Sequence, residues 1–412
     1  MTGKNQGFIA NTPDSGGSYV AFNYSDDGSP QRGTEPADKG NGWRPPSYGR
    51  RGRVLAPRVY AALAILLVLA GGIAAAVYLG EGSGGAAPSG ASQAAGATLV
   101  TTLTDPDTAA MVVSLAYSPD RSTLAVADQD GNIYLWDTKT WQILTTFTDP
   151  NDMGANAIAF SPDGTELAAA GNFGSTYVWG ISASRVIATL SDPGCCGNTS
   201  VSSVAFSPDG TAIAAGDFDG SAYLWNLSSR KITATLTGSD GLDVGTVAFS
   251  PDGSTVATGT TPPVDGNGGG DVYLWDSHTG QLRATLPDPG SAGIAALAFA
   301  PGGDKLAAGD SNGSTYLWST SSDRLAATLT NADSDDSAAG ETFVAFVPGS
   351  TTLAIAGDGN SIYLWNSRTA QISSILTSVN SGPLVSSMAF ASDGKTLAVG
   401  GEDGSISVWH IT

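Results

Sequence analysis

The side chains of this sequence that could do chemistry are mostly carboxylates set in tight turns. The chain holds 38 Asp and Glu, 18 Lys and Arg, and two histidines. In segments 128–132 and 217–221 aspartates alternate along a short loop, as hard oxygen ligands do in calcium loops. Neither segment has the full ligand spacing or the distant bidentate glutamate, and Asp-Gly is also a preferred hairpin turn. We therefore predict structural turns at both segments, with a Ca²⁺ site as the alternative.

The sequence contains no constellation typical of an enzyme. His278 and His410 are not part of a Ser/His/Asp set, no His and Cys cluster has zinc spacing, and no glycine-rich loop opens a helix. The two cysteines, Cys195 and Cys196, are adjacent, so they form either a strained vicinal disulfide or two thiols, and no disulfide framework. We predict a protein that is not an enzyme, with no catalytic residue, no bound metal and no cofactor.

The carboxylates belong to an element that recurs seven times. A tripeptide ending in tryptophan recurs at intervals of 43 to 50 residues, and a turn of the Ser-Pro-Asp-Gly type, or a variant of it, precedes each copy. A period of this length indicates stacked supersecondary units. The repeat signature comprises Trp136, Trp179, Trp225, Trp275, Trp318, Trp365 and Trp409.

One unit, 203–236, shows how each copy is built. Short apolar runs at 203–206, 212–215, 221–225 and 231–236 alternate with turns rich in Pro, Gly, Asp and Ser. Four short strands joined in this way make an antiparallel meander, and no helical period interrupts it. The sequence therefore predicts seven similar four-stranded sheets.

The last unit lacks its fourth strand, because three residues follow Trp409. At the other end of the repeats, segment 97–106 matches the fourth-strand pattern of 144–150. We therefore expect the first and last strands to pair, which closes the array into a ring and removes its exposed sheet edges. The predicted fold class is all-β: a seven-bladed ring whose N-terminal strand completes the last blade.

Because of these repeats, residues 97–412 resemble a WD40-repeat seven-bladed β-propeller of the bacterial, membrane-anchored type. The Trp-Asp pair of that family occurs here at Trp136-Asp137 and Trp275-Asp276, and its Gly-His pair does not occur. The resemblance therefore implies a propeller without the histidine-anchored hydrogen-bond network of many family members. We expect packing of Phe, Leu and Trp side chains to stabilise the blades instead.

An antiparallel meander places alternate turns on opposite faces of the ring. We define the lower face by the turns that join first to second and third to fourth strands, and the upper face by the other loops. All ten basic residues of 97–412 lie in or beside lower turns, whereas 22 carboxylates and no basic residue belong to the upper face. The basic residues are Arg121, Lys139, Arg185, Arg230, Lys231, Arg283, Lys305, Arg324, Arg368 and Lys395.

The upper face also carries the long loops, at 192–198, 260–271 and 331–341. Loops on a rigid scaffold are common binding sites, and a negative face attracts cations or a basic partner. The alternative is that these acids only keep the surface soluble. The candidate acidic binding face comprises Asp128, Asp130, Asp217, Asp219, Asp310, Asp335, Asp336 and Asp403.

Three segments precede the ring. Residues 1–58 are polar and rich in Gly, Ser and Pro, which predicts a disordered tail. Residues 59–79 carry no charge and are long enough to span a bilayer, so we predict a transmembrane helix; a cleaved signal peptide or a buried core helix is the alternative. Residues 80–96 are a flexible linker of Gly, Ala and Ser. Arginines precede the helix and no basic residue follows it in the linker, which places the N-terminus in the cytoplasm and the propeller outside.

Together these features predict a single-pass protein of the cell membrane whose extracytoplasmic propeller is a scaffold or sensor module for protein partners. Similar bacterial propellers occur as outer sensor domains joined through a membrane helix to Ser/Thr protein kinases, and a tail of 58 residues has no room for a kinase. The acidic propeller argues against nucleic acid as a partner. The alternative function, by analogy of fold, is an extracytoplasmic cation-dependent binder or hydrolase that uses the acidic upper face.

Overall fold

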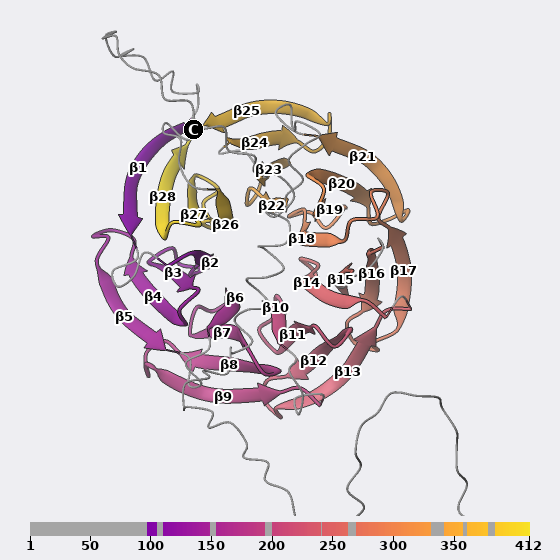
Figure 1. Ribbon diagram of the computed structural model, residues 1–412, viewed down its shortest axis with the longest axis horizontal. Coiled ribbons are helices and arrows are strands. Elements are labelled where there is room, and N and C mark those ends of the chain that lie inside the picture. The colour runs from indigo at the N-terminus through magenta and orange to yellow at the C-terminus, as the bar shows by residue number, and fades with distance from the viewer. Residues whose placement is uncertain are drawn as a thin grey trace, which may run out of the picture. The chain divides into compact units, whose positions relative to one another are not determined.

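The structure, a computed structural model, describes residues 97–104, 110–148, 154–193, 200–239, 241–262, 269–330, 342–356, 361–377 and 384–412. These residues form seven four-stranded antiparallel sheets, so the predicted seven-bladed propeller is confirmed (Figure 1). Within this described part, no helix has the length and apolar character needed to cross a membrane. The predictions for 1–58, 59–79 and 80–96 concern residues outside it.

Six blades are made of strands that follow one another along the chain, and the seventh combines both ends of the ring. Blade 1 comprises β2 (Val112–Tyr117), β3 (Thr123–Asp128), β4 (Asn132–Asp137) and β5 (Ile143–Thr148); blade 2 comprises β6 (Ala155–Phe160), β7 (Glu166–Gly171), β8 (Ser175–Gly180) and β9 (Arg185–Ser191); blade 3 comprises β10 (Val201–Phe206), β11 (Ala212–Asp217), β12 (Ser221–Asn226) and β13 (Lys231–Thr237). Blade 4 comprises β14 (Asp243–Phe249), β15 (Thr255–Thr261), β16 (Asp271–Asp276) and β17 (Leu282–Pro287); blade 5 comprises β18 (Ile294–Phe299), β19 (Lys305–Asp310), β20 (Ser314–Ser319) and β21 (Arg324–Thr330). Blade 6 comprises β22 (Phe343–Phe346), β23 (Thr352–Ala356), β24 (Ser361–Asn366) and β25 (Gln371–Thr377); blade 7 comprises β26 (Val385–Phe390), β27 (Thr396–Gly401), β28 (Ser405–Ile411) and β1 (Ala97–Thr104).

The position of a strand within its blade explains its sequence pattern. The first strand of each blade lies nearest the centre of the ring and the fourth lies on the rim (Figure 1). Middle strands are covered on both sides, so β12 buries four consecutive residues, from Ala222 to Trp225. The rim strand β13 instead alternates, because Leu236 is buried while Thr235 and Thr237 are exposed. The apolar runs and the Thr-rich runs of the repeat therefore correspond to middle and rim strands.

The Ser-Pro-Asp-Gly sequences form lower turns whose aspartates are structural. In blade 3 the Ser207 hydroxyl donates a hydrogen bond to Asp209 Oδ1 at 2.6 Å, and the Thr211 amide donates to the same oxygen at 3.1 Å. These hydrogen bonds lower the pKa of Asp209. Gly210 has a φ of 70°, which a residue without a Cβ adopts without strain. The same serine-to-aspartate bond holds Asp120, Asp163 and Asp252.

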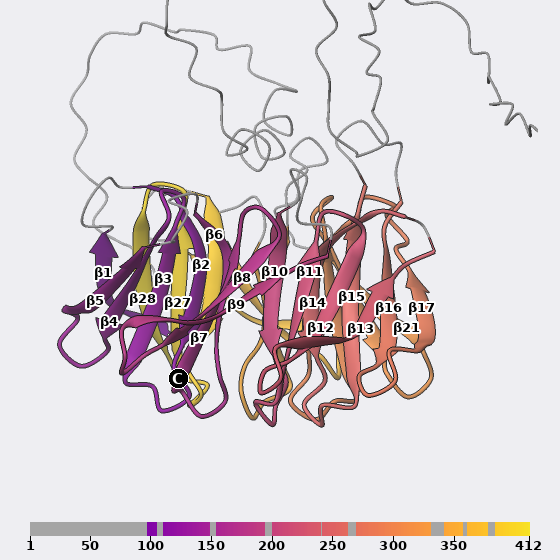
Figure 2. The same cartoon turned by 90° about the horizontal axis from the view of Figure 1, so that it is seen from below.

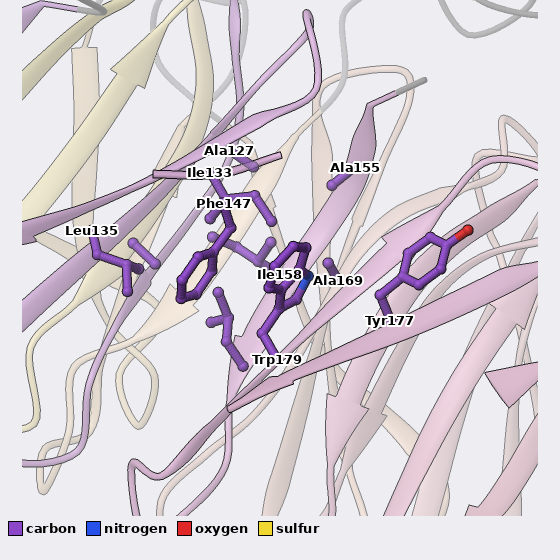
Figure 3. Close-up of a cluster of buried hydrophobic side chains, with 11 residues drawn as sticks. Ala127, Ile133, Leu135, Phe147, Ala155, Ile158, Ala169, Tyr177 and Trp179 are labelled. Carbon is purple, nitrogen blue, oxygen red and sulfur yellow. The ribbon is translucent and has the colours of Figure 1, made fainter. Parts of the chain in front are cut away.

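The hydrophobic core consists of seven clusters, and each cluster joins two neighbouring blades. In each cluster the signature tryptophan of one blade packs with an apolar residue on the rim strand of the blade before it. Between blades 1 and 2 the Phe147 ring stacks on Trp179, with 4.6 Å between ring centroids and 3° between planes (Figure 3). The leucines of the other six junctions are Leu103, Leu190, Leu236, Leu286, Leu329 and Leu376. This packing agrees with the expectation that apolar side chains hold the blades together.

Polar groups add hydrogen bonds within and between blades. In blade 4 the Trp275 indole N–H donates to the Thr258 hydroxyl at 3.0 Å. Between blades 3 and 4 the Val247 amide donates to the Ser203 hydroxyl at 3.1 Å, and equivalent bonds join the inner strands of blades 1 and 2 and of blades 7 and 1. Where blades 1 and 6 have Val126 and Ile355 in place of Thr258, the buried indole N–H has no partner among the described residues. In blade 3, which has Ala215 at this position, the indole N–H of Trp225 faces Asp192. The Trp-to-Thr hydrogen bond is therefore not a general device of this ring.

The N-terminal strand closes the ring, as predicted. β1 pairs antiparallel with β28 in a register that sets Leu103 opposite Ile406. Leu103 is buried in the cluster between blades 7 and 1. The lower turns of the same two blades are joined by an ion pair of 3.1 Å between Arg121 Nη1 and Asp393 Oδ2. Both apolar and polar contacts therefore connect the first blade to the last.

Candidate binding face

The turns between second and third strands form much of the upper face, opposite the C-terminus (Figure 2). Three predicted site residues, Asp128, Asp217 and Asp310, end the second strands of blades 1, 3 and 5, and their side chains are buried. Each accepts a hydrogen bond from a backbone N–H of the turn that follows it. These three carboxylates therefore support their own turns, and they are not available at the surface. The donors are the amides of Asn132, Asp219 and Ser314, at 2.7, 3.0 and 2.6 Å.

Three other predicted site residues present their carboxylates to solvent. Asp130, Asp219 and Asp403 are exposed at the tips of the upper turns of blades 1, 3 and 7. Asp335 and Asp336 lie outside the described residues. The candidate acidic face is therefore divided into an exposed set and a buried set, because alternate positions of one turn point outward and inward.

Asp192 of blade 2 and Asp217 of blade 3 form a buried carboxyl pair. Among the described residues, the Asp217 carboxyl and the Trp225 indole N–H are the polar groups that face Asp192, but no hydrogen bond of normal geometry reaches either Asp192 oxygen or Oδ2 of Asp217. Burial, and then the charge of Asp217, raises the pKa of Asp192 to about 8. Burial, and then the charge of Asp219, raises the pKa of Asp217 to about 6. The pair therefore retains a proton at neutral pH, since two adjacent buried carboxyls do not both ionise readily.

The equivalent junction between blades 4 and 5 satisfies its carboxyl groups. Asp288 takes the place of Asp192, and Asp310 takes the place of Asp217. The Tyr316 hydroxyl donates a hydrogen bond to Asp310 at 3.1 Å. Burial raises the pKa of Asp310, while hydrogen bonds from Ser314, Tyr316 and Asn312 act in the opposite direction. The donors to Asp288 are the backbone N–H groups of Gly290, Ala292 and Gly293, at 2.8, 2.8 and 3.1 Å.

Two aromatic side chains that the sequence analysis did not single out are exposed on the upper face. Phe173 and Phe218 occupy the upper turns of blades 2 and 3, and they retain 36% and 40% of their accessible surface. Asp243, at the start of β14, is half-buried beside the same turns, where burial and the charge of Asp219 raise its pKa. The recurring Asp-Pro after rim strands, as at 192–193 and 288–289, was a sequence signal for the buried carboxyls.

Several basic residues of the lower face make contacts within the ring. Arg230 of blade 3 donates to the Ile187 carbonyl of blade 2 at 2.7 Å, and Lys305 of blade 5 donates to the Ser367 carbonyl of blade 6. A pocket between the lower turns of blades 2 and 3 is lined by residues that include Asp209 and Glu166. Asp209 accepts hydrogen bonds within its own turn, so its carboxylate has a structural role at this pocket.

In the described part of the chain, no three His, Cys, Asp or Glu side chains gather in a way that could hold a metal ion. At 217–221 the Asp217 and Asp219 side chains accept hydrogen bonds from backbone N–H groups of their own turn, at 3.0 and 2.9 Å. These are the contacts of a structural turn. They give the Ca²⁺ alternative no support.

Comparison with known proteins identifies one family. Residues 111–410 match the family described as the IFT122 first beta-propeller. No curated protein matches the chain. The match covers all seven blades except β1 and therefore coincides with the ring that the repeats predict.

Proposed function

Since the chain belongs to the IFT122 first beta-propeller family, we propose that it is a scaffold whose upper face binds protein partners. A closed propeller has a rigid frame that presents its loops on two faces, and binding residues concentrate on such loops. The observation that carries the proposal is the separation of charge between the faces. The upper turns expose Asp130, Asp219 and Asp403, whereas basic residues such as Arg230 and Lys305 belong to the lower face. Such a face favours a basic partner.

We further propose that residues 59–79 anchor the protein in the cell membrane, with the N-terminus in the cytoplasm and the propeller outside. The support for this proposal is in the sequence. Residues 59–79 carry no charge, several arginines precede them, and the Gly/Ala/Ser linker that follows contains one glutamate and no basic residue. The cationic residues of a partner would then meet the acidic face outside the cytoplasm.

The proposed role is non-catalytic. The carboxyls with the most perturbed pKa, Asp192 and Asp217, are fully buried, so a substrate cannot reach them. His278 and His410 lie on the lower side of blades 4 and 7. At His278 the ring Nδ1 lies 3.1 Å from the Ser277 hydroxyl, but that hydroxyl donates its hydrogen bond to the Gly253 carbonyl. Ser277 is therefore held as part of the turn and is not activated as a nucleophile, which supports binding over hydrolysis.

Site-specific photocross-linking in the cells that produce the protein tests the binding face. A benzophenone amino acid replaces Asn312 in an upper turn of blade 5 or, as the matched control, Lys139 in a lower turn of blade 1. Both positions are exposed, so both tolerate the larger side chain. We expect protein adducts from position 312 and few from position 139. Adducts from position 139 alone, or equally from both, would contradict an upper binding face.

A further inference from the structure

We propose that Phe173 and Phe218, together with Asp219 and Asp243, form a docking site for a basic polypeptide segment that carries apolar side chains beside its arginines or lysines. The inference rests on the proposed function: it specifies where on the upper face a partner binds and what chemistry the bound segment has. The site spans the upper turns of blades 2 and 3 and the start of blade 4.

Hydrogen bonds through Ser200 join the two aromatic turns. The Phe218 amide donates to the Ser200 carbonyl at 3.2 Å, and the Ser200 hydroxyl donates to Asn172 Oδ1 at 2.7 Å. Phe173 directly follows Asn172, which also forms a β-bridge with Ser200. The two phenylalanines are therefore held in adjacent turns on one rigid frame, although 45 residues separate them in the sequence.

The two aromatic side chains are exposed to solvent, and one of them has a strained backbone. Each keeps more than a third of its surface accessible, and an exposed pair of rings on one face is typical of a binding surface. Phe173 also has a φ of 66°, in the left-handed region that bulky residues avoid. At such a turn position Asn or Gly folds with less strain. An aromatic residue that is both exposed and strained is readily explained by a contact with a partner.

The charge beside Phe218 is negative. Asp219 is exposed beside Phe218, and the Tyr223 hydroxyl holds it in place with a hydrogen bond of 2.6 Å. The charged side chains that act most strongly on Asp217 and Asp243 are carboxylates. Beneath the turns lies Asp192, which is fully buried and has Asp217 and Asp219 as its charged neighbours. Among the described residues, no hydrogen bond of normal geometry reaches its two oxygens.

A basic and apolar segment complements both properties. A guanidinium or ammonium group pairs with Asp219 and Asp243, and the face of an aromatic ring attracts the same cation. Aliphatic side chains next to that cation cover the exposed rings and exclude water from the ion pairs. An acidic or purely polar segment gains neither contact.

Binding of a defined peptide to the full-length protein tests this site. The probe is a fluorescein-labelled octapeptide that alternates arginine and leucine, with binding measured by fluorescence anisotropy at several salt concentrations. Two comparison peptides replace every arginine by glutamate or every leucine by serine. We expect the Arg-Leu peptide to bind, and each comparison peptide to bind at least about tenfold more weakly.

Variants locate the binding. We expect Phe218→Ala, Phe173→Asn and Asp219→Asn each to raise Kd about three- to tenfold. The matched controls are Asp304→Asn, which removes one exposed charge from a lower turn of blade 5, and Leu144→Ala, which removes an exposed apolar side chain from the rim. Both should leave Kd within about twofold.

Phe173→Asn separates binding from folding. Because Asn tolerates a positive φ, this variant should unfold at a temperature equal to or above that of the wild type and still bind the peptide more weakly. Weaker binding in a protein that is at least as stable cannot be a consequence of misfolding. Unchanged binding in both phenylalanine variants would overturn the inference.

A pH series gives a second readout. The titratable groups at the site are Asp192, Asp217, Asp219, Asp243 and Tyr223. A cation bound above them favours the ionised form of the carboxyl pair, so Kd should fall about threefold from pH 6 to pH 8. The fall should be smaller in Asp192→Asn and unchanged in the lower-face control Asp304→Asn. A Kd independent of pH in the wild type would contradict the placement of the cation above the pair.

The remaining outcomes distinguish this inference from the proposed function. If Asp403→Asn weakens binding as much as Asp219→Asn, the whole acidic face attracts the peptide and the docking site is overturned, while an upper binding face stands. If the wild type does not bind the Arg-Leu peptide, the docking site is overturned. Cross-linking at position 312 then decides separately whether the upper face binds partners.

Discussion

At the scale of single residues, the carboxyl groups of Asp192 and Asp217 differ from their counterparts in blades 4 and 5. Asp288 and Asp310 receive backbone and tyrosine donors, whereas Asp192 faces the Asp217 carboxyl and the Trp225 indole without a hydrogen bond of normal geometry among the described residues. An unpaired buried carboxylate is costly, so the folded protein keeps the pair partly protonated. The aspartates at this repeat position therefore stabilise the junction between blades 4 and 5, whereas at the junction between blades 2 and 3 they make stability depend on pH.

The first stability prediction concerns Asp192→Asn. The pKa of Asp192, about 8, and that of Asp217, about 6, lie above the usual unfolded value of about 3.9. The folded state therefore binds protons that the unfolded state has released between about pH 4 and pH 8, and the free energy of unfolding falls as pH rises through this window. Asn removes the charge, so the variant should be more stable than the wild type by about 1–3 kcal/mol at pH 8 and similar to it at pH 4.

Urea unfolding at pH 4, 6 and 8 measures this difference. Asp288→Asn is the matched control. The Asp288 carboxylate accepts three hydrogen bonds from backbone N–H groups, and asparagine would replace one of its two acceptor oxygens by an NH₂ donor. That variant should lose about 1–3 kcal/mol at pH 8. Destabilisation of the protein by Asp192→Asn at pH 8 would show that the Asp192 carboxylate is satisfied in solution.

At the scale of elements, each blade is held by the rim strand of the blade before it. The Phe147 ring of β5 covers Trp179 of β8, while Leu144 on the same strand keeps 59% of its surface exposed. Strand alternation places these two side chains on opposite sides of β5 and gives them different roles. The blade junctions, more than the separate blades, therefore contain the buried apolar surface.

Truncation of Phe147 tests this view of the blade junction. Phe147→Ala should lower the free energy of unfolding by about 3–5 kcal/mol, because it removes a buried ring and leaves a cavity beside Trp179. Phe147→Leu should cost less than about 1.5 kcal/mol, since leucine fills this place at the other six junctions. Denaturant unfolding followed by tryptophan fluorescence measures both. A loss from the control Leu144→Ala as large as that from Phe147→Ala would refute the assignment.

At the scale of the whole molecule, the ring depends on a strand that is far from its partner in the sequence. β1 pairs with β28 and places Leu103 in the cluster between blades 7 and 1. Without this strand, β28 would expose an unpaired edge and the last junction would lose its rim residue. Closure therefore makes every blade the neighbour of two others.

Leu103→Ala should destabilise the full ring by about 2–5 kcal/mol through the cavity it leaves. The closing blade should lose more stability against local opening than the other blades. Hydrogen exchange of the backbone N–H groups of β28 should therefore accelerate more than that of β12. Val100→Ala is the control, since Val100 lies on the same strand and is 52% exposed. Equal exchange rates in β28 of the wild type and Leu103→Ala would mean that β1 does not secure the ring.

The class of fold, the number of blades, their strands and the closing strand were all predictable from the repeats. This was predictable because each blade is a local meander of about 45 residues, in which the strand period and the turn residues act over short distances. The structural role of the lower-turn aspartates was also predictable, because the turn forms within four residues. The Ser207 hydroxyl donates to Asp209, and Gly210 adopts the positive φ of the turn. The match to a propeller family agrees with this reading.

Contacts between blades, which the repeats do not predict, determine which acidic residues are available to a partner. Asp217 and Asp219 are two residues apart in one turn, yet the first is buried against Asp192 of another blade and the second is exposed. Phe173 and Phe218 become neighbours because both turns contact Ser200. Burial and proximity of this kind arise between blades, from residues that are distant in the chain, and no pattern within a single repeat encodes them.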